Sequence, residues 1–367
     1  MLGNEVIGSN RKDQHVALAN QQFTMASASD LEQTRFVHHS LPEIKVADVS
    51  LKTSVAGLEF AMPFFVNAMT GGSEKTGAIN QLLGILGRET KIPLATGSIS
   101  AALKDPSVAH TFSIMRQENP DGIIFANLGA HHDVENAKRA VDVLEADALQ
   151  IHLNAPQEIV MPEGDRDFSM WMRNIEALVR SLEVPVIVKE VGFGMSRETV
   201  DQLASLGVET VDISGVGGTD FARIENARRT KDSYAYLYGW GQSTIISMVE
   251  AMSLPASSRP QIIASGGVKT PLDIVKLLAL GAEAVGLSNR FLQLVKDYSV
   301  EQAIEEVQVF CESITAIMTL LGARDIASLR QTDLVLAPAV EAWCKARSID
   351  WISYANRSSQ GVTSFSP

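Results

Sequence analysis

Short apolar or alternating runs recur along the chain, and a helix-like stretch follows most of them. The strand-like runs occupy residues 64–69, 94–98, 123–129, 148–154, 185–192, 210–215, 261–267 and 284–289. The segments between them include VDVLEAD, VDQLASLG and PLDIVKLLALG, and the last two end in Gly, as helices often do. Eight strand–helix units in about 230 residues predict an α/β protein with a (β/α)8 TIM barrel. A doubly wound sheet shares this alternation but normally needs fewer strands.

The barrel prediction divides the chain into three parts. Residues 1–60 are expected to form an N-terminal arm with short elements that contributes to the functional site. Residues 61–330 contain the barrel, closed by helices within 299–330. Residues 331–367 are expected to form a C-terminal helix and a frayed tail, because the chain ends in the polar run NRSSQGVTSFSP.

Polar residues mark the end of every predicted strand. In a (β/α)8 barrel the carboxyl ends of the strands meet at one face, where the loops build the site. Any single polar residue there is explained by a hydrogen bond at the start of a loop. Eight in succession instead predict a large polar ligand, because buried polar groups need partners. The residues are Asn67 with Thr70, Ser98, Asn127, His152 with Asn154, Lys189 with Glu190, Ser214, Gly266 with Gly267, and Ser288.

Two of these strand ends indicate the kind of ligand. SGGVK (265–269) and VGLSNR (285–290) follow the seventh and eighth strands, where such barrels commonly bind phosphate. Lys189 lies in the otherwise apolar run PVIVKEV and needs an anionic partner. A buried ion pair is the alternative, although Glu190 is a poor partner because adjacent strand residues point to opposite faces. A ligand with a phosphate group would fit the glycine loops, and a polarisable ring edge would serve as the partner of Lys189. We therefore predict that the ligand is FMN.

A second group of cations predicts an anionic substrate. The arm carries Arg11, Lys12 and His15. An insert of about 28 residues after the sixth strand is long enough to be a lid, and it carries Arg223, Arg228, Arg229 and Lys231. Solvated surface is the alternative for each of these residues. Glu158 is the predicted Mg²⁺ ligand, because Mg²⁺ binds one or two carboxylates together with substrate phosphate oxygens.

Composition narrows the choice of partners. The chain has 367 residues, is 46% hydrophobic and carries a net charge of −12, which argues against nucleic acid binding. The N-terminal residues contain no apolar signal-peptide core, and no stretch reaches the roughly 18 apolar residues of a membrane span. Cys311 and Cys344 form no CxxC motif. We therefore expect a cytoplasmic protein without metal-binding or disulfide-bonded cysteines.

Several strings together resemble the type 2 isopentenyl diphosphate isomerases. They run in order from about residue 10 to 295: NRKDQH, AMTGGS, ATGS, QIHLNAPQE, MPEG, IVKEVGFGM, DISGVGGTDF, IENARR and SGGVKTPLD. The resemblance implies an FMN-containing barrel that interconverts isopentenyl and dimethylallyl diphosphate. It also implies a requirement for Mg²⁺ and for flavin reduced by NADPH, and a homo-oligomer of four or more subunits.

The resemblance also assigns residues. FMN is expected at Ala68, Met69, Thr70, Ser98, Asn127, Lys189, Ser214 and Thr219, and its phosphate at Gly267, Val268, Lys269, Ser288 and Asn289. The predicted substrate-binding and catalytic residues are Arg11, Lys12, His15, His152, Asn154, Gln157 and Arg228, with Glu158 on Mg²⁺. Three positions depart from the family pattern. Gln14 replaces an acidic residue, while Val216 and Asn289 stand where relatives often have Arg.

The isomerisation adds one proton to an allylic system and removes another. A reduced, anionic flavin is expected to stabilise the developing cation, with its N5 as acid or base and Lys189 near N1. His152 either moves a proton or only orients the substrate. An FMN-dependent 2-hydroxy-acid oxidase or dehydrogenase is the nearest alternative, but SGVGGTDF (214–221) lacks the His and Arg expected there. A non-catalytic flavin-binding barrel is the alternative of a different class.

Overall fold

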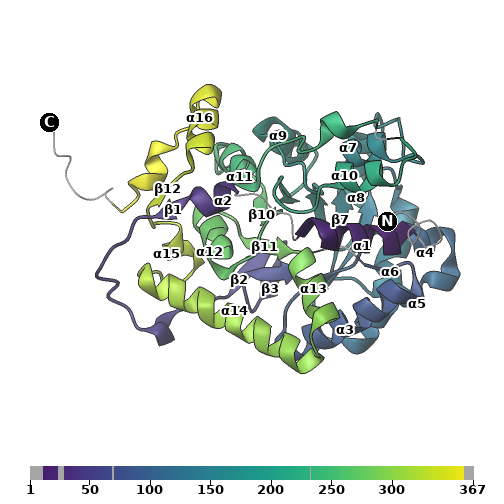
Figure 1. Ribbon diagram of the computed structural model, residues 1–367, viewed down its shortest axis with the longest axis horizontal. Helices are drawn as coiled ribbons and strands as arrows, with labels where there is room; N and C mark the ends of the chain where they lie inside the picture. Colours follow the sequence, from purple (N-terminus) through teal and green to yellow (C-terminus); the bar gives the residue numbers. More distant parts are fainter. Residues whose placement is uncertain (1–10, 24–28, 68–69, 232, 359–367) are drawn as a thin grey trace.

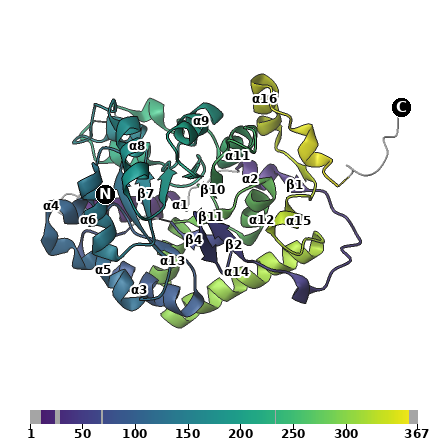
Figure 2. The same ribbon diagram turned by 180° about the vertical axis from the view of Figure 1, so that it is seen from behind.

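Eight parallel strands form a closed barrel, which confirms the predicted fold (Figures 1 and 2). The computed structural model describes residues 11–23, 29–67, 70–231 and 233–358, with the side chains of residues 11, 12 and 20–23 excepted. The strands are β4 (Phe64–Val66), β5 (Leu94–Ala95), β6 (Ile124–Gly129), β7 (Ala148–His152), β8 (Val186–Lys189), β9 (Thr210–Asp212), β10 (Gln261–Ser265) and β11 (Ala284–Leu287). They pair in chain order, and β11 closes the barrel on β4.

Helices follow the strands and surround the barrel (Figure 1). The main ones, in chain order after β4 to β11, are α3 (Glu74–Thr90), α5 (His110–Glu118), α6 (Val134–Leu144), α8 (Trp171–Ser181), α9 (Arg197–Ser205), α11 (Thr244–Met252), α12 (Pro271–Leu280) and α14 (Val300–Leu320). Shorter elements in the loops are α4 (Ser100–Lys104), η2 (Pro106–Val108), α7 (Ala155–Val160), α10 (Phe221–Ala227), η3 (Ala235–Leu237) and α13 (Asn289–Asp297).

Local sequence sets the limits of these helices. Ser73, Thr270 and Ser299 cap α3, α12 and α14 through capping boxes, in which side chain and backbone satisfy each other's hydrogen bonds. The predicted terminating glycines are also present, since Gly207 and Gly281 have φ of +88° and +122° after α9 and α12.

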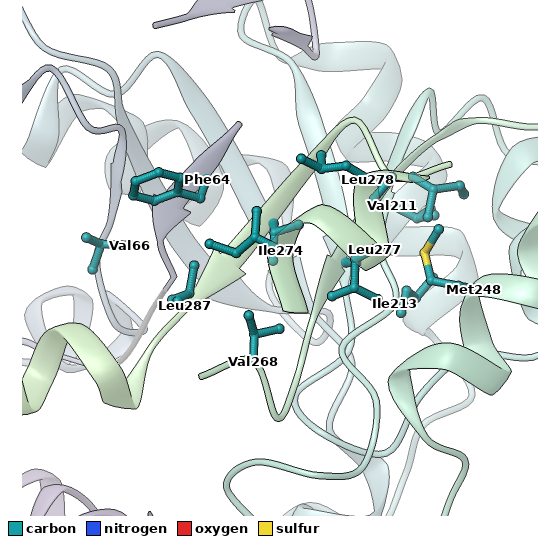
Figure 3. Close-up of a cluster of buried hydrophobic side chains, with 14 of the residues drawn as sticks. Phe64, Val66, Val211, Ile213, Met248, Val268, Ile274, Leu277, Leu278 and Leu287 are labelled. Carbon is teal, nitrogen blue, oxygen red and sulfur yellow. The ribbon is translucent and has the colours of Figure 1, made fainter. Parts of the chain in front are cut away.

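The outer hydrophobic core lies between the strands and the surrounding helices. Figure 3 shows strand residues such as Phe64, Val66 and Val211 beside residues from α11 and α12, among them Met248 and Leu277. These side chains are fully or almost fully buried. The outward-facing positions of the strands therefore supply the apolar surface that holds the helices in place.

The barrel interior has an apolar lower layer and a polar upper layer. In the lower layer, Phe65, Phe125, Ile187 and Ile263 pack together. A hairpin formed by β2 (Thr53–Val55) and β3 (Leu58–Phe60) closes the bottom of the barrel, because Val55 and Phe60 belong to the same cluster. Two residues further along the strands, the interior positions are Asn67, Asn127, Gln150, Lys189, Asp212 and Ser265, all buried. The polar layer is thus the floor of the site.

The terminal segments pack on the barrel and on each other. In the arm, α1 (Arg11–Phe23) contacts α3, α10 and α13, and α2 (Asp30–Gln33) contacts α11, α12 and α16 (Pro338–Arg347). The remaining elements are β1 (Arg35–Phe36), which pairs with β12 (Leu334–Val335), together with η1 (Val46–Asp48), α15 (Ile326–Leu329) and η4 (Ile352–Ala355).

The C-terminal segment is anchored as far as the structure describes it. Glu250 on α11 accepts hydrogen bonds from Trp343 Nε1 at 2.7 Å and Arg347 Nε at 2.8 Å, which hold α16. Arg357 donates to the Ala279 carbonyl at 2.7 Å, and the backbone N–H of Ser358 donates to Asp333 at 2.8 Å. Residues 359–367 of the predicted tail lie outside the described residues. No helix within the described ranges has the length and apolar character needed to span a bilayer.

Candidate functional site

A cavity of about 680 Å³ lies at the carboxyl ends of the strands. This volume lies within the usual range for pockets that bind small molecules and cofactors. Most of the predicted residues whose side chains are described line it: His15, Ser98, Asn127, His152, Asn154, Gln157, Glu158, Lys189, Ser214, Thr219, Gly267, Val268, Lys269, Ser288 and Asn289. Ala68 and Met69, and the side chains of Arg11 and Lys12, lie outside the described part of the chain.

Two predicted residues lie elsewhere. The Thr70 hydroxyl donates to Asn80 Oδ1 on α3 at 2.5 Å, so Thr70 supports the loop after β4 from behind. Arg228 does not line the cavity either, and its guanidinium donates to Glu225 and, at 2.6 Å, to Glu163. Arg223 is the insert arginine that lines the cavity, where it lies over the Tyr238 ring at 4.4 Å.

The loops after β9 and β10 approach each other so closely that only glycine fits. Gly266 and Gly267 have φ of +97° and +75°, in the left-handed region. A Cβ on Gly266 would lie 2.1 Å from the Gly215 carbonyl oxygen, and one on Gly267 would lie 2.8 Å from the Gly217 backbone. These glycines bring the two loops together next to the N-terminus of α13, whose backbone N–H groups and helix dipole favour an anion.

Asn289, the third position that departs from the family pattern, lies at the N-terminus of α13. Asn289 Nδ2 donates to the Ala19 carbonyl of α1 at 2.9 Å, and its Oδ1 is buried without a hydrogen-bond partner among the described residues. Arg290 donates to Glu306 at 2.8 Å on α14. Both side chains are therefore engaged elsewhere, and backbone N–H groups, with the Ser288 and Lys269 side chains that line the cavity, are the donors left for a phosphate.

Lys189 is 5% exposed and lies in the polar layer of the barrel interior. Burial lowers the pKa of its ammonium group, whereas the Asp212 and Glu190 carboxylates raise it. Its Nζ donates to the Glu190 backbone carbonyl at 2.7 Å. The Glu190 carboxylate is turned to its own loop, where it accepts from the N–H groups of Val191 and Phe193, and burial raises its pKa to about 7. Asp212, on a neighbouring strand, is thus the acid whose charge most favours the Lys189 ammonium group.

The β7–α7 junction brings together the polar residues of the fourth strand. The fourth strand was expected to span residues 148–154. It instead ends at His152, and Gln157 and Glu158 lie on α7, where Pro156 occupies the first turn. Asn154 Nδ2 donates to Glu158 Oε1 at 2.8 Å, and the N–H of Asp165 donates to Glu158 Oε2 at 2.8 Å.

A buried carboxylate that the sequence analysis did not single out connects the arm, α7 and α10. Glu225 Oε1 lies 3.0 Å from His15 Nε2 and accepts from Gln157 Nε2 at 2.8 Å, while Arg228 donates to Oε2. Burial would raise the pKa of Glu225, but the nearby His15 ring and the hydrogen bonds from Gln157 and Arg228 lower it to about 2. The i, i+3 spacing of Glu225 and Arg228 in IENARR was the available signal.

A hydrogen-bonded pair of polar residues near β6 was also missed. His132 Nε2 lies 2.8 Å from Ser100 Oγ, and the adjacent His131 lines the cavity. Burial, with the neighbouring His131, lowers the pKa of His132 to about 4, so this ring is neutral near pH 7. Gln150 and Asp212 were also missed, since both were interpreted only as parts of strands.

Sequence comparison places the chain among known proteins. The profile of a family described as FMN-dependent dehydrogenase matches residues 132–336. An isopentenyl-diphosphate delta-isomerase from a Streptomyces species is 49% identical over 352 residues, covering 95% of each chain. The protein of the same name from Staphylococcus haemolyticus is 49% identical over 340 residues, covering 93% of this chain and 97% of the relative.

Solved structures share the fold at low identity. A flavocytochrome b2 variant with pyruvate bound has a TM-score of 0.65 at 21% identity and covers 89% of this chain and 84% of that one. A mandelate oxidase variant has a TM-score of 0.60 at 15% identity, covering 90% and 93%. At this identity the likeness extends to the barrel alone, whereas the relatives above match almost the whole sequence. The chain belongs to the isopentenyl-diphosphate delta-isomerase family, on a barrel of the FMN-dependent dehydrogenase type.

Proposed function

We propose that this protein interconverts isopentenyl diphosphate and dimethylallyl diphosphate by a 1,3-proton shift, as a step of isoprenoid biosynthesis. The observation that carries the proposal is 49% identity, over 95% of the chain, to a relative named for that reaction. The cavity supports it, because it has a backbone anion site at β10 and β11 and a carboxylate and amide pair at α7.

The residues present fit FMN. The glycine-only approach of the β9 and β10 loops and the N-terminus of α13 suit its phosphate. The buried Lys189 ammonium is a cationic group at the cavity that a polar ring edge would satisfy. Ser98, Asn127, Ser214 and Thr219 would hold the ring and the ribityl chain. When bound and reduced, by NADPH in our proposal, FMN supplies an electron-rich ring beside the alkene.

The protein's own residues prepare the site for a cation-like transition state. Protonating the alkene places positive charge on a tertiary carbon, which water would trap, so the site must be dry and preorganised. The arm helix α1 contacts α10 and α13 above the cavity. Glu225 holds Gln157 in place at 2.8 Å, and Asn127 holds His152 at 2.9 Å. These hydrogen bonds keep both side chains oriented when the substrate enters.

The diphosphate would be held at the α7 side of the cavity. Glu158 is the proposed Mg²⁺ ligand, with substrate phosphate oxygens and water completing the coordination. Asn154 and the N–H of Asp165 orient the two Glu158 oxygens. Arg11 and Lys12 are proposed diphosphate contacts on the family resemblance alone. Arg223 is added because it lines the cavity, whereas Arg228 is already bound to Glu225 and Glu163.

An anaerobic assay tests the proposal. Purified protein with FMN, Mg²⁺ and NADPH is incubated with isopentenyl diphosphate, and dimethylallyl diphosphate is measured. We expect turnover with reduced flavin and none when FMN is omitted from apoprotein. Lack of product with reduced, flavin-loaded protein would refute the isomerase function. Light scattering on the same sample tests the further proposal of a homo-oligomer of four or more subunits.

Oxidation of a 2-hydroxy acid is the second candidate, favoured by the family profile and the shared barrel. The segment Ser214–Phe221 lines the cavity but contains neither His nor Arg to act as base and carboxylate clamp. We therefore expect no reduction of bound FMN by lactate or mandelate. Rapid bleaching of the flavin by either acid would favour oxidation.

A further inference from the structure

A chain of hydrogen bonds crosses the polar layer from β9 to the end of β7. Asn67 Nδ2 donates to Asp212 Oδ2 at 2.7 Å, and Gln150 Nε2 donates to Asn67 Oδ1 at 3.3 Å. Asn127 Nδ2 donates to Gln150 Oε1 at 3.3 Å, and Asn127 Oδ1 lies 2.9 Å from His152 Nδ1. β4 is not adjacent to β7 or β9 in the barrel, so these contacts pass through its interior.

At one end of this series of hydrogen bonds, the carboxylate of Asp212 determines which partner donates and which accepts. Besides Asn67, the Ser265 hydroxyl and the Ser214 N–H donate to it, at 2.7 and 3.2 Å, and the Lys189 ammonium lies nearby. Three donors converge on its two oxygens, so the carboxylate accepts from each of these partners. Asn67 must therefore present its NH₂ group to Asp212 and its carbonyl to Gln150.

The choice of donor and acceptor at Asn67 fixes the choice at the next residue, because each side-chain amide has one donor group and one acceptor group. Gln150 must turn its NH₂ group to Asn67 and its carbonyl to Asn127. Asn127 then turns its carbonyl to His152, whose Nδ1 must carry the proton. Asn67, Asn127, Gln150 and Asp212 are at most 3% exposed, so bulk water cannot satisfy a reversed amide.

We propose that Asp212 is a positioning residue that fixes His152 as the Nδ1–H tautomer through Asn67, Gln150 and Asn127. The basic lone pair of the neutral ring is then on Nε2. In this state Nε2 accepts a hydrogen bond or a proton, and it donates to a ligand only after the ring becomes a cation. How this tautomer acts on a diphosphate substrate rests on the proposed function. The assignment of the tautomer rests only on the hydrogen bonds described above.

The test reads the tautomer directly. Flavin-loaded protein containing ¹³C,¹⁵N-histidine is examined by solid-state NMR at pH 8.5, well above the usual histidine pKa of about 6.5. Ring ¹⁵N resonances distinguish protonated from unprotonated nitrogens, and a His152→Gln difference spectrum assigns one of the seven histidines. We expect Nδ1–H at His152 in the wild type. Nε2–H there would overturn the proposal whatever the variants do.

Asp212→Asn is expected to exchange donor and acceptor in every hydrogen bond between residue 212 and His152. The Ser214 N–H and Ser265 hydroxyl hold the new amide by its oxygen, so its NH₂ group faces Asn67. All three amides then turn, and His152 becomes the Nε2–H tautomer. The double variant Asn67→Asp with Asp212→Asn returns an acceptor to Gln150, and we expect Nδ1–H again. Ser265→Ala is the matched control, because it removes a bond to Asp212 outside the chain and should leave Nδ1–H.

The outcomes separate this inference from the proposed function. Retention of Nδ1–H in a folded, flavin-binding Asp212→Asn variant would show that Asp212 does not set the tautomer. Failure of the double variant to restore Nδ1–H would likewise contradict the relay. Absence of isomerase activity in the wild type would refute the proposed function and leave the tautomer measurement intact.

Discussion

Glu158 is a carboxylate at the cavity whose two oxygens are both oriented by neighbours, Asn154 and the N–H of Asp165. For Glu158→Gln we expect the Mg²⁺ concentration at half-maximal activity to rise at least about tenfold, because an amide is a weaker ligand for a hard cation. A Mg²⁺ titration of isomerase activity measures this. Asp167→Asn, at an exposed carboxylate in the loop that follows α7, is the control. An unchanged titration for Glu158→Gln would place the metal ligand elsewhere.

Glu225 makes a pH-dependent contribution to stability. Its pKa is about 2 in the folded protein and near 4.5 unfolded, so folding favours the charged form. Its stabilisation is complete above pH 4.5 and is lost as the pH falls through 2, and it amounts to at most about 3 kcal/mol. We expect Glu225→Gln to be less stable than wild type at pH 7, with the difference shrinking between pH 4.5 and 2. Urea unfolding across this window checks it, and a constant difference would contradict it.

At the scale of elements, the site depends on how closely two loops approach. Gly266 combines a φ of +97° with a Cβ position 2.1 Å from the Gly215 carbonyl oxygen. We expect Gly266→Ala to reduce FMN affinity by at least about tenfold, since the β10 loop must move away from β9. Fluorescence titration of apoprotein with FMN measures the affinity. Gly57→Ala carries a similar φ of +78° in open space, so it controls for backbone strain alone.

Element boundaries also decide the chemistry around β7. Gln150 and His152 share one face of the strand, as the alternation in LQIHLN predicted. Asn154 comes after the strand and precedes α7, so it reaches Glu158 on the first turn of that helix rather than extending the strand face. Pro156 lies in the first turn of this helix, and the local pattern alone does not tell whether such a proline ends a strand or begins a helix.

At the scale of the whole molecule, one hairpin closes the barrel below the site. Phe60 is 2% exposed and lies against Phe65 and Phe125, with ring centroids 6.4 and 6.2 Å apart. We expect Phe60→Ala to lower the free energy of unfolding by about 3–5 kcal/mol, because it leaves a cavity among strands that cannot collapse. Chemical denaturation measures the loss. Leu41→Ala, at an 80% exposed position, should cost less than about 0.5 kcal/mol.

The sequence predicted the eight strands, their order and most residues around the cavity. Those features depend on short-range alternation, helix caps and turn residues, and on the rule that barrel strands meet at their carboxyl ends. The resemblance strings add the expected phosphate loops, and Gly267 and Ser288 of these loops line the cavity. Thr70 and Arg228 show the limit, because local pattern does not tell whether a polar side chain faces the cavity or a neighbouring helix.

The sequence by itself determined the barrel and the set of polar groups at its mouth, because both follow from periodicities that adjacent residues create. Only the tertiary structure decided which of these groups bind each other. Asn67 and Asp212 are 145 positions apart, and Arg228 and Gln14 are 214 apart. The first pair forms because closing the barrel brings distant strands around one interior, and the second forms because α1 packs against α10. The direction of the hydrogen bonds that reach His152 is therefore a property of the closed barrel.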